Sequence, residues 1–360
     1  MSKLKKITKA PLFLPVFSLL LVMIINVVVD IAQGNAFYEF FKITTTTTTA
    51  GSTVLFGRII DILNRGSEVA ILAIGMTLVV AASGGTDISV GSVMSLAGGM
   101  CCMLLAGYGV TSVSEYNVPL FVGILAGIGV AVLCGAFNGF LVSYLKIQPM
   151  VATLILYSAG RAIGLLLCNS MIVYIRVESF KFFGAYCGIF PTPILIAAAC
   201  ILITALVLKF TALGTYIQAV GINKDAARIS GYKSQQIIFL AFVLCGLFAG
   251  ITGIVNTSRI YSADTNNIGL NLEMDAILAV ALGGNSLGGG KFRLSGSIIG
   301  AYTIQAISTT LLAVGISTAQ MPVFKAIIVV IIVAIQAPAV KAWSAKRAAM
   351  RADAMKGGVK

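Results

Sequence analysis

Long apolar runs separated by short polar segments dominate the chain. The runs at 11–31, 69–83, 118–145, 194–208 and 323–340 approach the roughly 20 residues that a helix needs to cross a bilayer. They lack the even alternation of apolar and polar positions that marks a transmembrane β-barrel. In lipid, a single segment satisfies its own backbone hydrogen bonds only as an α-helix. The pattern therefore predicts an all-α fold, a polytopic transmembrane helical bundle.

About ten spans follow when the shorter apolar runs are included. We expect helices over 11–31, 66–83, 89–107, 118–145, 150–168, 191–209, 237–258, 272–284, 295–313 and 322–340. An even number of spans leaves both chain ends on one side of the membrane. The predicted domains are an N-terminal tail over 1–10, a transmembrane domain over 11–340 and a basic C-terminal tail over 341–360.

The composition agrees with a surface that faces lipid. Hydrophobic residues make up 58% of the 360 residues and charged residues only 10%, whereas soluble domains carry roughly 25% charged residues. Too few charges remain to hydrate a water-facing surface. We therefore expect a lipid bilayer around the chain.

The positions of Lys and Arg predict the orientation. If both ends are cytoplasmic, the cytoplasmic segments hold 17 of the 25 basic residues, the opposite segments hold six, and two lie within spans. Short cytoplasmic loops of membrane proteins are enriched in Lys and Arg, so we predict cytoplasmic termini. The net charge of +13 is spread over chain ends and short loops. Nucleic-acid binders instead cluster it on a soluble face, and we expect no nucleic acid partner.

Three of the connections between the predicted spans are long and polar. The external loop 32–65 contains the run Thr44–Thr49, expected to be poorly ordered, and the amphipathic segment Gly57–Arg65, expected to lie at the membrane surface. A second external loop covers 169–190. The longest internal cytoplasmic loop, 210–236, is too short for an ATPase domain.

No phosphate-binding loop is found in the sequence. The nearest segment, Gly288–Lys291, has Asn285 where GxxxxGK[ST] requires its first glycine, and Phe292 follows the lysine. The chain also contains no histidine, the commonest metal ligand. We expect no cofactor and no metal in this chain. Any ATP that drives it must bind to another chain.

A segment with glycines, serines and Asp87 lies between two apolar segments, from Gly84 to Ser92. Non-helical backbone at membrane depth must be buried in protein or line a water-filled cavity, and acidic residues there tend to be functional. On this interpretation Asp87 and Ser89 belong to a pathway. Alternatively, Asp87 lies in a cytoplasmic turn and caps the next helix. Both interpretations stay open.

The segment around Asp225 predicts a short helix within loop 210–236. Its small residues leave a flat helix face for a partner, and Gly231 lets the chain turn at its end. The residues concerned are Asp225, Ala226, Ala227, Arg228 and Gly231. The alternative is an ordinary loop between helices.

Glu273 and Asp275 open the predicted helix 272–284, where negative charge interacts favourably with the helix dipole. Arg259 is their expected electrostatic partner. The loop that precedes them, with Asp264, Asn266 and Asn267, lies outside the membrane in the ten-span arrangement.

An acidic-Ala-Ala motif followed by glycine, as in Asp225–Gly231, resembles the coupling loop of ATP-binding-cassette importer permeases. Together with Gly84–Ser92, it makes the chain similar to the ribose/galactose-type sugar permeases from about Asp61 onward. Lys146–Leu154 and Gly283–Gly290 extend this likeness. Within the family the chain most resembles the galactofuranose permeases, notably in Ile60–Arg65, Lys146–Pro149 and Ala263–Leu270. One departure is Thr86, where the family usually has isoleucine.

This resemblance implies a permease subunit of the bacterial inner membrane that performs no covalent chemistry. The implied partners are an ABC ATPase subunit, a second permease subunit in a homodimer or heterodimer, and a periplasmic sugar-binding protein. Galactofuranose is the sugar to which the likeness points.

The resemblance also implies roles for individual residues. Asp225, Ala226, Ala227, Arg228 and Gly231 would form the helix that docks on the ATPase. The expected translocation pathway consists of Asp87, Ser89, Asn138, Gln148 and Thr153, which would bind sugar hydroxyls transiently. The binding protein would contact Asp264, Asn266 and Asn267.

A self-sufficient, ion-coupled secondary transporter is the alternative function. Such proteins concentrate acidic or histidine residues near the membrane midplane. This chain has few acidic residues well inside its predicted spans and no histidine. Copurification with an ATPase distinguishes the two functions.

Overall fold

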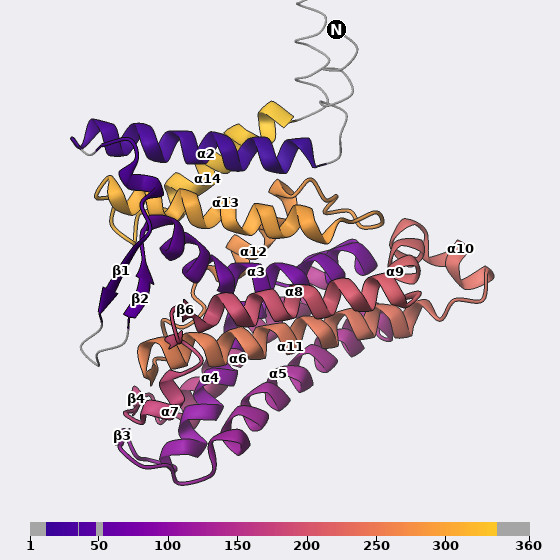
Figure 1. Cartoon of the computed structure of the whole chain (residues 1–360). Helices are drawn as coiled ribbons and strands as arrows, with labels where there is room; N and C mark the ends of the chain where they lie inside the picture. Colours follow the sequence, from indigo (N-terminus) through magenta and orange to yellow (C-terminus); the bar gives the residue numbers. More distant parts are fainter. Residues whose placement is uncertain (1–11, 35, 48–52, 337–360) are drawn as a thin grey trace, which may run out of the picture.

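The computed structural model describes residues 12–34, 36–47 and 53–336, and long α-helices dominate this part of the chain (Figure 1). Every predicted apolar helix has a counterpart, so the predicted helical bundle is confirmed. The helices are α2 (Phe13–Ala32), α3 (Arg58–Ser83), α4 (Val90–Ala106), α5 (Leu120–Ser143), α6 (Pro149–Leu167), α8 (Thr192–Phe210), α11 (Ser234–Ile260), α12 (Leu272–Leu282), α13 (Leu294–Ala313) and α14 (Met321–Gln336).

Seven of these helices are long and apolar enough to cross a membrane, namely α2, α3, α5, α6, α8, α11 and α13. The remaining three are shorter. α4 has 17 residues and α12 only 11, against the roughly 20 that a span needs. The chain is thus a multi-pass helical protein, and the number of ten spans stays a prediction.

The connections gather at two opposite ends of the bundle (Figure 1). One end, here called the sheet end, carries the short strands, the 3₁₀ helix η1 (Glu39–Phe41) and the helix α7 (Glu178–Lys181). The other, here called the α10 end, carries α9 (Leu213–Ile222) and α10 (Lys224–Ile229). The first residues of α2 and the last turn of α14 point away from the sheet end.

Short strands at the sheet end qualify the all-α prediction. They form an antiparallel pair β1–β2, a three-stranded sheet in the order β3-β4-β7, and a hairpin β5–β6. Strands β3, β4 and β7 come from three different connections, so this sheet ties α4, α6 and α11 together at that end. The strands are β1 (Thr44–Thr47), β2 (Thr53–Phe56), β3 (Ser112–Val113), β4 (Val173–Ile175), β5 (Tyr186–Cys187), β6 (Phe190–Pro191) and β7 (Ser262–Ala263).

In loop 32–65, the expectation of poor order was wrong for the first four threonines. Thr44–Thr47 is an ordered strand because it pairs with Thr53–Phe56, and β-branched residues favour this conformation. The last two threonines of the run lie outside the described residues. Arg58–Arg65 forms the first turns of the 26-residue helix α3, and its place at the membrane surface stays a prediction. The ion pair between Arg58 and Asp30 of α2 ties these turns to the bundle.

Helix α3 forms the centre of the bundle. Every residue from Gly66 to Ser83 is buried, as expected for a helix that is apolar on all sides. Outer helices instead expose large apolar side chains. Leu125 and Leu133 of α5 are 64% and 69% exposed, and Ile203 of α8 is 61% exposed. Such a continuous apolar exterior fits lipid as the surrounding medium.

Glycines allow α5 and α11 to approach closely. A Cβ atom added at Gly135 would overlap the Phe242 carbonyl oxygen, and one added at Gly246 would overlap that of Ala131. Small residues at such crossings let the backbones of membrane helices touch. This crossing brings the middle of α11 next to Asn138.

Candidate functional site

The non-helical segment between α3 and α4, residues 84–89, is here called the break segment. Gly84 ends α3 with φ of +67°, a left-handed conformation that favours glycine. Asp87 follows and is only 2% exposed. Its Oδ1 accepts hydrogen bonds from Ser89 N at 2.9 Å and from Ser89 Oγ at 2.7 Å. Asp87 is therefore buried in the bundle and bonded to Ser89, the residue that precedes α4, and its role in a pathway stays a prediction.

Side chains from α5 and α6 complete this site. Asn138 Nδ2 donates to Ser89 Oγ at 2.8 Å, and Ile88 N donates to Thr153 Oγ1 at 3.2 Å. Asp87, Ser89, Asn138 and Thr153 are all at most 2% exposed and together are here called the break cluster. Four of the five predicted pathway residues thus come together from three separate parts of the chain.

The break cluster is closed in this structure. The space between Asp87, Asn138 and the glycines of the α5–α11 crossing is too small for a water molecule. Asn138 Oδ1 is buried there without a hydrogen-bond partner. Such an atom costs about 1–3 kcal/mol. It is also an acceptor that is free for a hydroxyl group whenever the helices separate.

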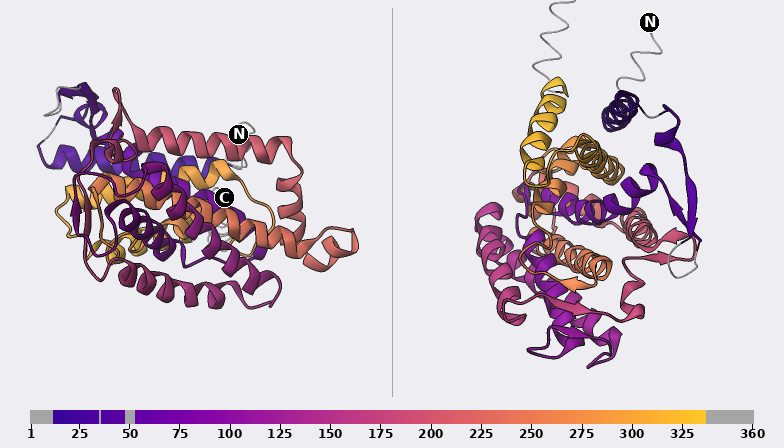
Figure 2. Two further views of the ribbon diagram at one scale, coloured as in Figure 1. Left: turned by 90° about the horizontal axis from the view of Figure 1, so that it is seen from below. Right: turned by 90° about the vertical axis from the view of Figure 1, so that its left-hand side faces the viewer.

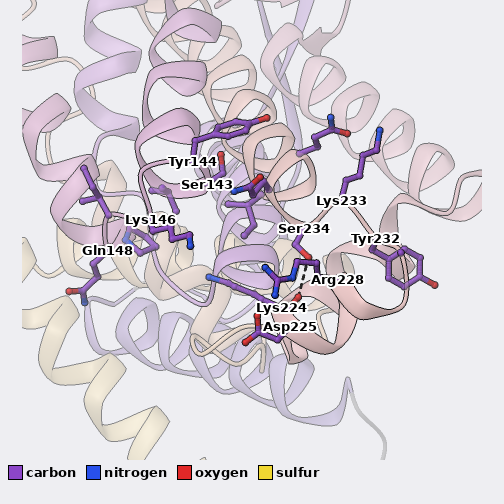
Figure 3. Close-up of a pocket in the computed structure, with 17 residues that line it drawn as sticks. Ser143, Tyr144, Lys146, Gln148, Lys224, Asp225, Arg228, Tyr232, Lys233 and Ser234 are labelled. Atoms are coloured by element: carbon purple, nitrogen blue, oxygen red, sulfur yellow. Dashed lines mark hydrogen bonds between the residues drawn. The ribbon is translucent and has the colours of Figure 1, made fainter.

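Gln148, the fifth predicted pathway residue, lies elsewhere. It precedes α6 and lines a groove of about 820 Å³ at the α10 end, shown in Figure 3. One wall of this groove is α10 and the start of α11. The other is the turn between α5 and α6, with Lys146. We call this cavity the basic groove because four basic side chains and one carboxylate line it.

Helix α10 is the short helix predicted around Asp225. Asn223 Oδ1 caps it by accepting from Asp225 N at 3.0 Å and from Ala226 N at 2.9 Å. The helix ends at Ile229, and Gly231 follows with φ of +87°. The predicted short helix and the turn at Gly231 are therefore confirmed.

The faces of α10 differ from the expected flat alanine surface. Ala227 points into the bundle and is 5% exposed, whereas Ala226 is exposed. Asp225 and Arg228 line the basic groove. Ile229 at the tip is 85% exposed, and sequence analysis missed it. Its apolar side chain among polar neighbours was the signal that would have revealed it.

Backbone contacts join α9 to the break segment. A Cβ atom added at Gly221, near the end of α9, would overlap the Ala81 carbonyl oxygen and lie 2.6 Å from Gly290 N. Gly290 N itself donates to Ala81 O at 3.0 Å. Ala81 belongs to the last turn of α3, directly before Gly84. A displacement of α9 therefore reaches the break segment through backbone atoms alone.

The loop with Asp264, Asn266 and Asn267 leads from the sheet end into the bundle. Asp264 accepts from Asn266 N at 3.2 Å and from Asn267 Nδ2 at 2.7 Å. Arg161 of α6 holds this loop through three backbone carbonyls, at 2.6–3.2 Å. Asn266 and Asn267 are exposed.

The loop runs along α4 for about two turns. Thr265 lies next to Gly99 of α4, whereas Gly269 meets Gly91 in backbone contact. These two glycines are about 12 Å apart along a helix that rises 1.5 Å per residue. The loop therefore does not stay at the surface of the sheet end.

Arg259 was wrongly expected to pair with Glu273 and Asp275. It pairs with Glu68 of α3 at 3.3 Å, because α11 lies beside α3 at the sheet end. Asp275 pairs with Lys325 of α14 at 2.7 Å. Glu273 is buried in the first turn of α12, consistent with the predicted helix start.

A bundle of apolar helices around a buried polar cluster, with an exposed helical loop at one end, is typical of a polytopic membrane protein. The chain belongs to the family described as the branched-chain amino acid transport system / permease component, whose model matches residues 58–336.

Curated relatives agree with this family. The galactofuranose transporter permease protein YtfT of Escherichia coli is 45% identical over 78% of this chain and 80% of its own length. The fructose import permease protein FruF of Bifidobacterium longum is 36% identical over 88% of this chain and 86% of its own. The ribose import permease protein RbsC of Escherichia coli is 34% identical over 76% of this chain and 83% of its own length.

Proposed function

We propose that this chain is the membrane-spanning permease subunit of an ATP-driven (ABC) importer of a monosaccharide. The observation that carries the proposal is the 45% identity to a galactofuranose permease across 78% of the chain. Fructose and ribose permeases are also relatives, so a sugar is the common substrate class. Galactofuranose is the first candidate. The relatives favour this function over an ion-coupled secondary transporter, because each is a permease of a sugar import system by name.

We place the α10 end in the cytoplasm and the sheet end outside the bacterial inner membrane, with ten spans, the transmembrane domain over 11–340 and cytoplasmic tails over 1–10 and 341–360. The charges support this orientation. Of the five ion pairs among the described residues, four lie at the sheet end and the fifth joins α12 to α14. Among the exposed basic residues of the described part that lack such partners, Lys42 and Arg176 lie at the sheet end, and the other seven lie at the α10 end, where positive charge favours the cytoplasm. These seven are Lys146, Lys209, Lys224, Arg228, Lys233, Lys291 and Arg293.

In this proposal the chain itself binds no cofactor and catalyses no reaction. A separate ATPase subunit binds and hydrolyses ATP and docks on α10 through Asp225, Ala226 and Arg228. A second permease subunit completes the pathway in a homodimer or heterodimer. A periplasmic sugar-binding protein approaches the sheet end, where Asp264, Asn266 and Asn267 are its proposed contacts.

Transport then requires the break cluster to open. Asp87, Ser89, Asn138 and Thr153 offer both hydrogen-bond donors and acceptors, which sugar hydroxyls need. Because the cluster is closed and satisfied mainly by its own members, it binds sugar only transiently. Weak binding suits a pathway, since a separate binding protein supplies the recognition.

The test is ATPase activity in nanodiscs. The chain is coexpressed with candidate ATPase and second-permease genes from the same genome, and a binding protein loaded with galactofuranose, ribose or fructose is added. We expect ATP hydrolysis to rise with one sugar and the rise to vanish when 225–231 is replaced by a Gly/Ser linker. If no ATPase copurifies and the chain alone accumulates sugar in proteoliposomes along an ion gradient, the proposal is wrong.

A further inference from the structure

The basic groove has two walls that are far apart in the sequence. The first is α10 with the start of α11, and Ser234 Oγ joins these by donating to Lys224 O at 3.2 Å. The second is the turn at 144–148 between α5 and α6. In Figure 3, Lys146 and Lys224 come from opposite walls. With about 820 Å³ between them, the walls leave room of the size that proteins use to bind ligands and side chains.

The positive charges that line the groove outnumber the negative ones. Lys146, Lys224, Arg228 and Lys233 line it together with Asp225 as the only carboxylate, and none of them forms an ion pair within the described residues. Clustered charges of one sign concentrate ligands of the opposite sign. The groove therefore selects an anionic occupant.

The second wall contains a residue with an unusual backbone conformation, Lys146. Lys146 adopts φ of +58°, a left-handed conformation that is uncommon and costly for a residue other than glycine. The turn is held by a hydrogen bond from Ile147 N to Leu141 O at 3.1 Å. Lys146 is exposed at this turn and lines the groove.

Several features favour a protein segment over a lipid headgroup. α10 extends beyond the ends of the neighbouring apolar helices (Figures 1 and 2). Its tip exposes Ile229, and an isolated large apolar residue of this kind suits a packed protein contact. The lining also includes Tyr232, Gln235 and Asp225, which bond peptide groups well, whereas Asp225 repels a phosphate.

Both walls are joined to the break segment. Behind the turn at 144–148, Pro149 packs against Gly85, where an added Cβ would lie 2.7 Å from the proline ring. Behind α10, Gly221 of α9 touches Ala81. A ligand that draws the walls together or apart therefore acts on the break segment from two sides.

We propose that the basic groove binds an acidic segment of the ATPase subunit, and that Lys146 in the turn between α5 and α6 is a second docking contact opposite α10. This inference rests on the proposed function and adds a contact to it. The ATPase would then hold two walls instead of a single helix, and a change in their separation would be transmitted to the break cluster.

The experiment compares two charge reversals at the same end of the molecule. Lys146→Glu lies in the groove, and Lys291→Glu is an exposed lysine outside it. Each full-length variant is placed in nanodiscs, and its affinity for the purified ATPase is measured at low and high salt. We expect Lys146→Glu to weaken binding about tenfold at low salt. Lys291→Glu should change it less than about twofold, because an exposed charge outside a contact contributes little.

A zero-length carbodiimide cross-link identifies the occupant. This reagent joins a lysine amine to a carboxylate that it touches. We expect Lys146 and Lys224 to be linked to one acidic ATPase peptide, and Lys146→Arg to lose its own link while retaining binding. Thermal unfolding of each variant shows whether the fold is intact.

The outcomes separate this inference from the proposed function. If wild type binds the ATPase and the two charge reversals behave alike, the groove contact is wrong and the importer function stands. If Lys146→Glu instead reduces bound phosphatidylglycerol with unchanged ATPase affinity, the groove is a lipid site and the inference is overturned. If wild type binds no ATPase, both proposals fail.

Discussion

The break cluster and the basic groove are two polar regions near the same end of the molecule, and they are built in opposite ways. In the break cluster, each polar side chain is buried and bonded to another polar group of the site. In the basic groove, the charged side chains are exposed and unpaired within the described residues. Burying an unpaired polar group is costly, whereas water hydrates an exposed charge at little cost.

This difference separates what each region does. The break cluster holds the helices together, and its opening must be driven from outside. The charged side chains of the basic groove form no ion pair within the described residues, so they are available to a partner. Gly221 connects the two regions, since α9 lies between α10 and the last turn of α3.

The largest expected effect comes from breaking that connection with Gly221→Val. The new side chain overlaps the Ala81 carbonyl oxygen, so α9 must move away from α3. Overpacking of this kind costs about 1–3 kcal/mol. We expect a lower unfolding temperature in detergent and loss of sugar-stimulated ATP hydrolysis.

Gly129→Ala is the matched control for this substitution. No atom lies within 4 Å of a Cβ atom added at Gly129 in α5, and alanine favours a helix by about 0.5–1 kcal/mol over glycine. The control should therefore raise or preserve the unfolding temperature. Equal loss in both variants would show that the contact at Gly221 is unimportant.

The next largest effect is expected when one of two aspartates, Asp87 or Asp225, is replaced by alanine. Asp87→Ala removes the acceptor for both Ser89 hydrogen bonds and leaves a buried hydroxyl and amide short of partners, at a cost of about 1–3 kcal/mol. We expect lower thermal stability and little sugar transport, with ATPase binding retained.

Asp225→Ala, in the basic groove, should show the reverse behaviour. The residue is exposed and its carboxylate forms no ion pair within the described residues, so stability should change by less than about 0.5 kcal/mol. ATPase affinity should change instead. Unfolding curves and pull-down of the ATPase measure the two properties separately. The comparison of the two regions fails if both variants lose the same property.

The smallest effect is expected in a test of orientation, which measures labelling and not activity. Cys187, in strand β5 at the sheet end, is the exposed one among the seven cysteines. A maleimide that cannot cross membranes should label it in intact spheroplasts, whereas Cys187→Ser should remain unlabelled. A cysteine introduced as Ile229→Cys should react only after lysis. Labelling in the opposite pattern would invert the proposed topology.

Prediction from sequence was most successful where the cause is local. Residues 224–229 form the expected helix because Asn223 caps its first turn and Gly231 permits the turn after its end. It was least successful where partners come from distant segments. Arg259 was assigned to Glu273 and Asp275, which follow it by 14 and 16 residues, whereas its partner in space is Glu68 of α3, 3.3 Å away.

Gln148, which precedes α6, and Thr153, in its first turns, illustrate the same limit over a short distance. Both were predicted to belong to one pathway. In the structure Gln148 lines the basic groove, whereas Thr153 belongs to the break cluster. Positions five residues apart on a helix are separated by about 7.5 Å along its axis. Which neighbour each one meets depends on how α6 packs against the break segment.

The sequence by itself determined that the chain is a bundle of apolar helices with a short polar helix between α9 and α11. Transfer of a side chain into lipid, helix capping and glycine turns depend on residue types that are adjacent in the chain. Only the tertiary structure decided that Asp87, Asn138 and Thr153 meet, and that Lys146 faces α10. Those contacts depend on how closely helix backbones approach, which is set by glycines on facing helices acting together.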